Sequence, residues 1–361
     1  MSKLKELYSQ WLAIQPFKAG DQTRLDQKFM LEFNYNSNHI EGNTLTYGQT
    51  EMLLLFGKVI DEANMRDLEE MKAHNVGLKM MQTEALETRP LTEAFIRQLH
   101  QTILREDYTI SRQLPDGSTM SYMIHAGQYK TRPNSVITVT GERFEYASPE
   151  ETPALMADLI QWYNEEENKG ELSPAELAAI FHYRYIRIHP FEDGNGRIAR
   201  LLVNFILLRH NYPMIIVRSK LKDAYLKVLN KCDTSVGPVP SDGAHATPSQ
   251  IEPFIEYIEN LISDEITNDI KFISEKAERV WWFDGTFITF RSNNTVKILQ
   301  LMTSNPDITV RELSEKLNIN KSAIQKQIKT LREKEYISRV GGKKGQWHVA
   351  IVCTAPKNSA K

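Results

Sequence analysis

The sequence predicts a mainly α fold with one small β element and a C-terminal winged helix-turn-helix. Three observations support this prediction. Apolar residues recur at helical spacing through most of the 361 residues. The pattern changes to a strand-like one only around residues 122–146. Near the C-terminus, two short helical segments precede a glycine-containing strand pair, which is the order typical of a winged helix.

The first 88 residues are predicted to be helical. A further amphipathic helix over 91–104 begins at Thr92 and ends before the polar turn at Pro115-Asp116-Gly117. The run Val136–Thr140, followed by Gly141-Glu142 and then Phe144 and Tyr146, predicts a β-hairpin.

Two helices are predicted on either side of a short loop. Ser173-Pro174-Ala175-Glu176 fills the N-cap, N1 and N3 positions of a capping box, so a helix begins at Ser173. Pro190 ends that helix at or just before His189. The next helix is expected from about Asn195 to about Arg209.

The remainder of the chain completes a four-part organisation. Turn-forming residues at 233–250 predict a long loop, and helices are expected from 251 to 282. Helices at 309–317 and 321–334, a turn at 318–320 and strands around 341–345 form the predicted winged helix. The expected parts are a helical region (1–88), a catalytic core (89–232), a loop with connecting helices (233–289) and the winged helix (290–361).

Composition and charge exclude several classes of protein. A formal net charge of -2 gives no overall attraction to nucleic acid or membrane. The two cysteines, Cys232 and Cys353, have neither disulfide-framework nor metal-ligand spacing. The N-terminal residues have no signal-peptide core, and no apolar run approaches membrane-spanning length. We therefore expect a soluble cytoplasmic protein.

The segment His189–Arg200 carries the chemistry. Gly194 and Gly196 allow close approach and positive φ, and the unpaired amides at the start of the following helix favour a phosphate. Arg197 and Arg200 lie three apart, so both guanidinium groups can face a polyphosphate.

Two side chains beside this anion site have catalytic potential. Asp193 could hold a Mg²⁺ ion that bridges phosphates. His189, with a pKa near neutrality, could take the proton of a hydroxyl that attacks an adjacent phosphorus. The alternative is a glycine turn with a helix-capping histidine, but histidine, acid, glycines, asparagine and two arginines converge within twelve residues.

This segment resembles the signature of the Fic family, HPFx(D/E)GNGRxxR, at every specified position. The resemblance covers roughly 90–230 and implies a Fic-type helical core with a β-hairpin flap. It implies a nucleotidyltransferase that moves AMP from ATP to a Ser, Thr or Tyr hydroxyl of a target protein. The implied roles are base for His189, Mg²⁺ ligand for Asp193 and loop anchor for Phe191. The implied phosphate site comprises Gly194, Asn195, Gly196, Arg197 and Arg200.

Other activities stay open. The same residues would serve a hydrolase that removes AMP from a modified protein. A kinase-like branch of the family has lysine at the second glycine of the motif, so Gly196 disfavours it. A transcriptional regulator could also use the anion site only to sense a nucleotide, and His189→Ala would distinguish sensing from transfer.

A second segment, Ser37–Asn43, resembles the inhibitory motif of the Fic family: Ser or Thr, three unspecified residues, Glu, then Gly or Asn. Ser37 and Glu41 are four apart, and we expect them on one face of a helix near 37–46. The hypothesis is that Glu41 pairs with Arg200 and so displaces a distal phosphate. The alternative is an ordinary capped surface helix.

Two further assignments concern target and adenine binding. Gly127, Gln128, Tyr129 and Lys130 resemble the flap, which would hold a target segment by main-chain pairing at a strand edge. The alternative is a structural hairpin. Tyr225 is expected either to enclose the adenine or to be a buried core residue.

The C-terminal module has a local excess of basic residues. Between 321 and 344 there are two acidic residues, Glu333 and Glu335, and eight basic ones. The lysines and arginines are at positions 321, 326, 329, 332, 334, 339, 343 and 344. Such a helix and wing could bind DNA phosphates. A winged helix can equally be a protein-docking or dimer module, so a homodimer is the other possible partner.

Overall fold

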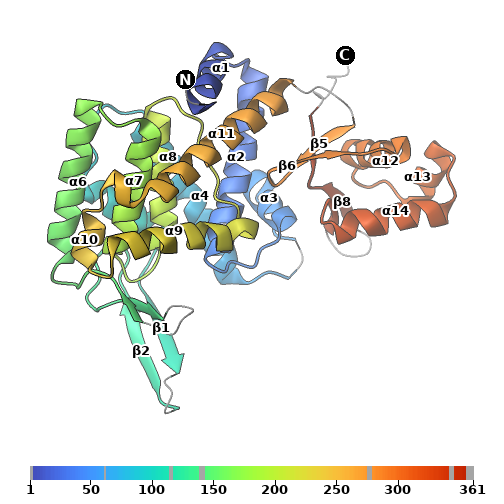
Figure 1. The fold of residues 1–361 in the computed structure, drawn as a ribbon. Helices are drawn as coiled ribbons and strands as arrows, with labels where there is room; N and C mark the ends of the chain where they lie inside the picture. Colours follow the sequence, from blue (N-terminus) through green and yellow to red (C-terminus); the bar gives the residue numbers. More distant parts are fainter. Residues whose placement is uncertain are drawn as a thin grey trace. The chain divides into compact units, whose positions relative to one another are not determined.

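The computed structural model describes residues 3–60, 62–113, 117–137, 143–274, 279–340 and 345–354. Its chain forms two compact units (Figure 1). The first unit comprises 1–13, 36–42 and 70–266, and the second comprises 14–35, 43–69 and 267–361. Each of the helices α2, α4 and α11 has residues in both units.

The first unit is helical, as predicted. Its helices, with those that continue into the other unit, are α1 (Lys3–Ala13), α2 (Ala19–Ile40), α4 (Met65–Ala85), α5 (Glu93–Leu104), α6 (Thr152–Lys169), α7 (Pro174–Ile188), α8 (Asn195–Arg209), α9 (Lys222–Val236), α10 (Pro240–Ala244) and α11 (Glu252–Ser274). Short 3-10 turns lie at η1 (Ser219–Leu221) and η2 (Pro248–Gln250).

Helices α7 and α8 form the centre of this unit. The predicted capping box is present: Ser173 Oγ accepts from the Glu176 amide at 3.2 Å, and the Glu176 carboxylate accepts from the Ser173 amide at 2.8 Å. Apolar side chains of both helices, including Phe181 and Phe205, are fully buried. Two adjoining helices thereby fix where the loop between them begins and ends.

Two hairpins lie between α5 and α6. Strands β3 (Ser135–Ile137) and β4 (Arg143–Glu145) pair antiparallel, as predicted. The sequence missed a longer hairpin, β1 (Tyr108–Gln113) with β2 (Thr119–Ile124), which projects from the helices in Figure 1. The predicted turns at 115–116 and 138–142 lie outside the described residues.

The predicted long loop at 233–250 is wrong in part. Helix α9 continues to Val236, and α10 follows with Pro240 in its first turn. Arg187 of α7 explains the compact path, because its Nη2 donates to Gly237 O at 2.8 Å and Val239 O at 3.0 Å. Turn-rich sequence alone could not show that a buried guanidinium organises these carbonyls.

The region around 37–46 also differs from prediction. Helix α2 ends at Ile40, Glu41 and Gly42 form a turn, and α3 (Tyr47–Phe56) begins only after the N-cap Thr46. Ser37 therefore lies in the last turn of α2, and Glu41 lies just beyond the helix.

The second unit contains α3, α12 (Asn293–Ser304), α13 (Val310–Leu317) and α14 (Lys321–Glu333), with strands β5 (Val280–Phe283), β6 (Thr286–Thr289), β7 (Ile337–Val340), β8 (Gln346–Val349) and β9 (Val352–Cys353). Strands pair in the order β6-β5-β9 and as β7-β8. The helices and the β7-β8 pair confirm the winged helix. The helix expected to reach 282 is wrong at its end, because Trp281 and Trp282 pair in β5 and pack inward, and α11 is described as far as Ser274.

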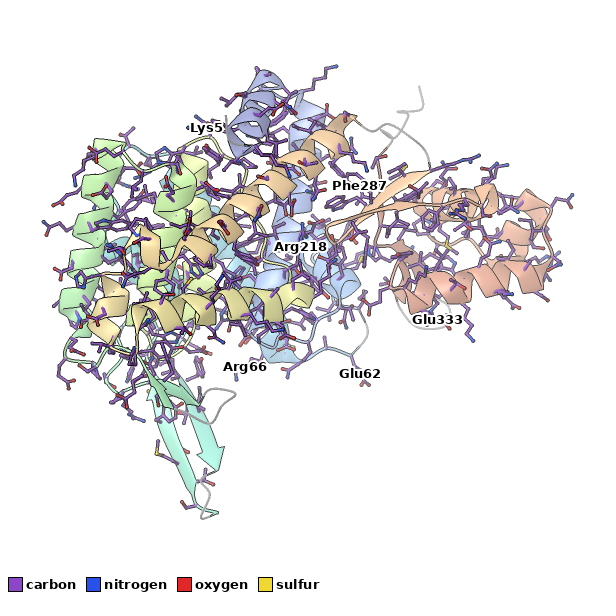
Figure 2. All side chains as sticks on the ribbon, in the orientation of Figure 1. Lys5, Glu62, Arg66, Arg218, Phe287 and Glu333 are labelled. Atoms are coloured by element: carbon purple, nitrogen blue, oxygen red, sulfur yellow. The ribbon has the colours of Figure 1, made fainter. Side chains whose placement is uncertain are left out.

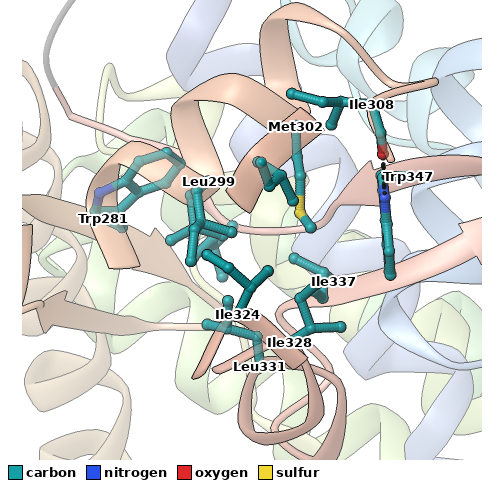
Figure 3. Packing of buried hydrophobic residues seen from close by; sticks show 12 residues of the cluster. Trp281, Leu299, Met302, Ile308, Ile324, Ile328, Leu331, Ile337 and Trp347 are labelled. Carbon is teal, nitrogen blue, oxygen red and sulfur yellow. Dashed lines mark hydrogen bonds between the residues drawn. The ribbon is translucent and has the colours of Figure 1, made fainter. Parts of the chain in front are cut away.

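The winged helix has its own core (Figure 3). Leu299, Ile324 and Ile337 from α12, α14 and β7 are buried together, and Trp347 Nε1 donates to Ile308 O at 2.9 Å. The predicted wing residues Gly341–Lys344 lie outside the described residues.

Candidate active site

His189 ends α7 in the left-handed conformation, with φ 51° and ψ 61°. Its amide donates to Tyr185 O at 2.9 Å, which completes the helix end. Its ring stacks on Tyr146, with 4.0 Å between the ring centroids and 17° between the planes. The helix end and the stacked ring together fix the direction of the imidazole.

The imidazole of His189 is neutral at physiological pH. Burial, and then the positive charge of Lys130, lower its pKa from the ordinary 6.5 to about 4, although the Ile186 carbonyl, Glu41 and Asp193 act in the opposite direction. A neutral imidazole has a free lone pair on one ring nitrogen, so His189 can accept a proton.

The loop after His189 is anchored in the core. Phe191 is fully buried, as predicted, and stacks on His100 with a centroid distance of 3.7 Å. Asn195 Oδ1 accepts from the Phe191 amide at 2.9 Å, and Asn195 Nδ2 donates to Phe191 O at 2.7 Å. The side chain of Asn195 thus bonds to the main chain across the loop. Only the main-chain amide of Asn195 is available to donate to a phosphate.

The start of α8 has the properties of an anion site. Gly194 is the N-cap, with φ 77°, and its amide donates to Asp193 Oδ1 at 2.6 Å. The amides of Asn195, Gly196 and Arg197 have no acceptor among the residues that the structure describes. Free amides at a helix N-terminus attract a negatively charged group.

Gly196 is required for close approach, but not for the positive φ that the sequence suggested. A Cβ at this position would collide with Glu41 Oε1 and lie 3.0 Å from Arg200 Nη1. The absence of a side chain therefore lets Glu41 and Arg200 meet over the first turn of α8.

The expected pairing of Glu41 with Arg200 is present. Arg200 Nη2 donates to Glu41 Oε1 at 2.7 Å and to Ser37 O at 2.8 Å, while its Nε donates to Ser37 Oγ at 3.0 Å. Partial burial alone would raise the pKa of Glu41, but the charge and hydrogen bond of Arg200 hold it below its ordinary value. Arg200 is therefore occupied by a carboxylate, a helix-terminal carbonyl and a hydroxyl.

Asp193 and Arg197 form a second ion pair at the helix start. Arg197 is buried, and its Nη2 lies 3.7 Å from Asp193 Oδ2. Tyr108 of β1 donates its hydroxyl to the same carboxylate oxygen. Burial would raise the pKa of Asp193, but Arg197, Tyr108 and the Gly194 amide lower it. Asp193 is thus a fixed, ionised carboxylate.

The flap assignment for 127–130 needs correction. These residues form a turn and a non-strand segment, so they present no strand edge. Gly127, with φ 75°, donates its amide to His100 Nδ1 at 2.9 Å, and the Tyr129 hydroxyl donates to Glu93 at 2.7 Å. Gln128 is exposed, whereas Lys130 is only 3% exposed and bonds to the carbonyls of Ile188 and His189. Long-range hydrogen bonds, which the sequence does not show, make this segment a support for the loop.

Tyr225 is 3% exposed, in agreement with the core alternative. Its hydroxyl lies 2.9 Å from His182 Nε2, and its ring packs near Phe254 and Tyr257. A contact with adenine stays a prediction.

Sequence reasoning missed His100, Tyr108 and Tyr146. His100 Nε2 lies 3.0 Å from Asp193 O, so this histidine joins the catalytic loop to the turn at Gly127. Its place on the apolar face of α5, beside Leu99 and Ile103, was the available signal. Tyr108 and Tyr146 lie in or beside strands, and only the fold brings them to the site.

Comparisons with known proteins agree with this geometry. The Fic/DOC family description matches residues 90–207, and a winged helix-turn-helix DNA-binding description matches 291–338. The chain is 57% identical to a Fic domain containing signaling protein from Bacteroides thetaiotaomicron, with a TM-score of 0.70, over 75% of this chain and 96% of that one.

The chain belongs to the Fic/DOC family. A Fic family protein from Desulfovibrio desulfuricans shares the fold over 96% of this chain and 93% of that chain, at 19% identity and a TM-score of 0.55.

Curated members of the family are more distant. The protein adenylyltransferase fic-1 of Caenorhabditis elegans is 29% identical over 249 residues, which is 68% of this chain. That of Caenorhabditis briggsae is 28% identical over 226 residues, which is 62% of this chain. The chain spans only 45% and 38% of the lengths of these two relatives, respectively.

Within the part of this family member that the structure describes, no helix is both long and apolar enough to cross a membrane. Figure 2 draws the side chains on the ribbon and labels Arg218. Arg218, on the segment after α8, pairs with Glu265 of α11 at 2.8 Å, and both side chains are buried.

Proposed function

We propose that this protein transfers AMP from ATP to a hydroxyl side chain of a target protein. One observation carries the proposal: a buried neutral histidine lies beside a helix start whose amides and two arginines are arranged for a polyphosphate. The names of the curated relatives, protein adenylyltransferases, support the same reaction.

The proposed reaction uses His189 as general base. Its imidazole takes the proton of the target hydroxyl as the oxygen attacks the α-phosphorus of ATP. The new oxygen–phosphorus bond forms while the bond from the α-phosphorus to the bridging oxygen breaks, and pyrophosphate leaves. The free amides of α8 and the Arg197 guanidinium stabilise negative charge on the phosphates during this step.

Asp193 fits a Mg²⁺ ion that arrives with the nucleotide. Its side chain is 36% exposed, is ionised and is held by Tyr108 and the Gly194 amide. No cluster of three or more His, Cys, Asp or Glu side chains suited to a metal occurs in the described ranges, so phosphate oxygens would supply further ligands. The ion would neutralise negative charge on the phosphates.

We infer that Glu41 inhibits this reaction. Its carboxylate occupies Arg200 at 2.7 Å, next to the amides of α8. A distal phosphate would need the same guanidinium and would meet the negative charge of Glu41. Release of Glu41 would therefore precede productive ATP binding.

Incubation of the protein with α-labelled ATP and Mg²⁺, followed by mass spectrometry, tests the transfer. Labelled AMP on protein hydroxyls is the expected result, and His189→Ala should abolish it. Loss of AMP from a modified protein, without incorporation, would favour the hydrolase. Nucleotide binding that survives His189→Ala, with no turnover in the unsubstituted protein, would favour a nucleotide sensor.

Target binding is proposed for the β1-β2 hairpin rather than for 127–130. These strands form a two-stranded sheet, and a target backbone would add to such a sheet as a further strand. The Tyr108 bond to Asp193 joins this hairpin to the carboxylate that is proposed to hold Mg²⁺. Hydrogen exchange of β1 and β2 amides should slow when a target peptide binds; unchanged exchange would refute this assignment.

A second function, DNA binding, is proposed for the winged helix. The exposed side of α14 carries Lys321, Lys326 and Lys329, and the matching family description is of DNA-binding domains. A gel shift with the full chain across a salt series tests it. Lys326→Glu and Lys329→Glu should weaken salt-sensitive binding, whereas Arg311→Glu on α13 should not. Absence of salt-sensitive binding would remove this function.

A further inference from the structure

The carbonyl end of α7 is bonded to a lysine from a distant segment. Lys130 Nζ donates to Ile188 O at 3.0 Å and to His189 O at 2.9 Å. The main-chain amide of Lys130 donates to Pro190 O at 2.9 Å. One residue thus holds three successive carbonyls, and the middle one belongs to the catalytic histidine.

Asn134 completes this contact. Its Nδ2 donates to His189 O at 3.3 Å and to Phe191 O at 3.0 Å, and its Oδ1 accepts from Lys130 Nζ at 2.8 Å. The two side chains are therefore bonded to each other as well as to the loop. Displacement of either would release the main chain on both sides of His189.

The three acceptors around Lys130 match an ammonium group. Nζ of Lys130 faces three acceptors, and only the protonated amine has three N–H donors. A cation at this place also compensates the negative end of the α7 dipole. Lys130 is 3% exposed, so water does not replace these bonds in the folded protein.

We propose that Lys130 is a positioning residue for His189: its ammonium group holds the carbonyl end of α7 and thereby fixes the imidazole toward the reacting phosphorus. The expected effect of Lys130 on turnover rests on the proposed function. Its expected effect on the pKa of the imidazole does not, because that pKa can be measured without turnover.

The charge of Lys130 affects the pKa of His189, and this pKa can be measured independently of turnover. Burial lowers the pKa of Lys130 to about 7, while Glu151 at the start of α6 acts to raise it. Lys130 in turn lowers the pKa of His189, with Glu41 and Asp193 acting against it and Tyr146 stacked on the ring. Loss of the lysine charge should therefore raise the pKa of the imidazole.

The experiment compares Lys130→Met, Lys130→Arg and Asn134→Ala in the full chain. NMR titration of the imidazole, assigned with His189→Gln, should show the pKa of His189 rising by about one unit in Lys130→Met. Lys130→Arg keeps the charge and should keep the low pKa. Asn134→Ala should raise the pKa less than Lys130→Met does, because no charge is removed.

Steady-state kinetics supply the second readout. Lys130→Met should lower kcat about 10- to 100-fold with little change in the KM for ATP, because the imidazole shifts while the phosphate site is intact. Lys130→Arg should restore part of this loss. Lys169→Met is the matched control, since Lys169 at the end of α6 pairs with Glu166 at the surface and should affect neither quantity.

Each outcome has a defined meaning. An unchanged imidazole pKa in Lys130→Met overturns the proposal, whatever happens to kcat. If that variant does not fold, Lys130→Gln, which retains two donors without charge, takes its place. Absence of AMP transfer by the unsubstituted protein would refute the proposed function and would leave the NMR titration as the test of Lys130.

Discussion

The two helix ends that meet at the catalytic loop are completed in opposite ways. At the end of α7, Lys130 and Asn134 satisfy the carbonyls from within the protein. At the start of α8, the amides of Asn195, Gly196 and Arg197 have no described acceptor. The protein itself satisfies the end of α7, whereas the start of α8 is the proposed phosphate site.

The charged side chains near the two helix ends also differ in how they interact with the helix dipoles. A cation beside the negative end of α7 is stabilising, whereas Arg197 and Arg200 lie near the positive end of α8, where cations are disfavoured. The arginines therefore need an anion. Asp193 and Glu41 supply it here, and the phosphates of a nucleotide would supply it during the proposed reaction.

The largest effect is expected at the ligand-facing end. Arg197→Gln should lower kcat/KM for ATP about 100-fold, because a charge-assisted bond to phosphate is lost. Kinetics with labelled ATP measure this. Arg209→Gln, at the opposite end of the same helix, is the control: Arg209 donates to Glu87 O and Arg89 O and should leave turnover nearly unchanged. Equal losses in both variants would contradict the assignment of α8 as the phosphate site.

Removal of the resident anion should act in the other direction. Glu41→Gly should increase AMP incorporation about 10- to 100-fold, as expected when a charge-assisted bond no longer competes for Arg200. Glu41→Gln should give an intermediate increase, since it keeps an acceptor but loses the charge. Unchanged incorporation in both variants would show that Glu41 does not control ATP binding.

A smaller effect is expected from Gly196→Ala. The added Cβ would collide with Glu41 Oε1, so it should weaken the pairing with Arg200 and raise incorporation about 3- to 10-fold. In a Glu41→Gly background the same substitution should give no further increase. An equal increase in both backgrounds would show that Gly196→Ala does not act through the contact between Glu41 and Arg200.

The smallest effect concerns stability. The pKa of Glu41 is lower in the folded state than in the unfolded state. The ionised side chain therefore adds to the free energy of unfolding above the unfolded-state pKa, and this stabilisation is lost as pH falls through the folded-state pKa. Glu41 is 38% exposed, so Glu41→Gln should cost only about 0–1 kcal/mol near pH 7. Denaturant unfolding should show the difference disappearing in acid. A difference that grows below pH 4 would contradict this linkage.

The sequence alone predicted the elements that depend on neighbours in the chain. The capping box at Ser173, the end of α7 before Pro190 and the positive φ of Gly194 are each decided within a few residues. The resemblance of Ser37–Asn43 to the family's inhibitory motif also anticipated the pairing of Glu41 with Arg200, although α2 ends one residue before Glu41.

Several features could not be predicted because partners far apart in sequence decide them. The turn-rich residues 233–250 follow a compact path around the buried Arg187, and the segment 127–130 becomes a support because Lys130 reaches α7. The side chain of Asn195 turns back to the Phe191 main chain. In each case a buried polar group found its partner only after folding.

The sequence by itself determined the chemistry available at the catalytic loop, because an imidazole, a carboxylate, two glycines and two guanidinium groups occur within twelve residues. Only the tertiary structure decided how those groups are held. Whether a helix end is satisfied by the protein or kept for a ligand depends on which distant donors and acceptors are buried beside it.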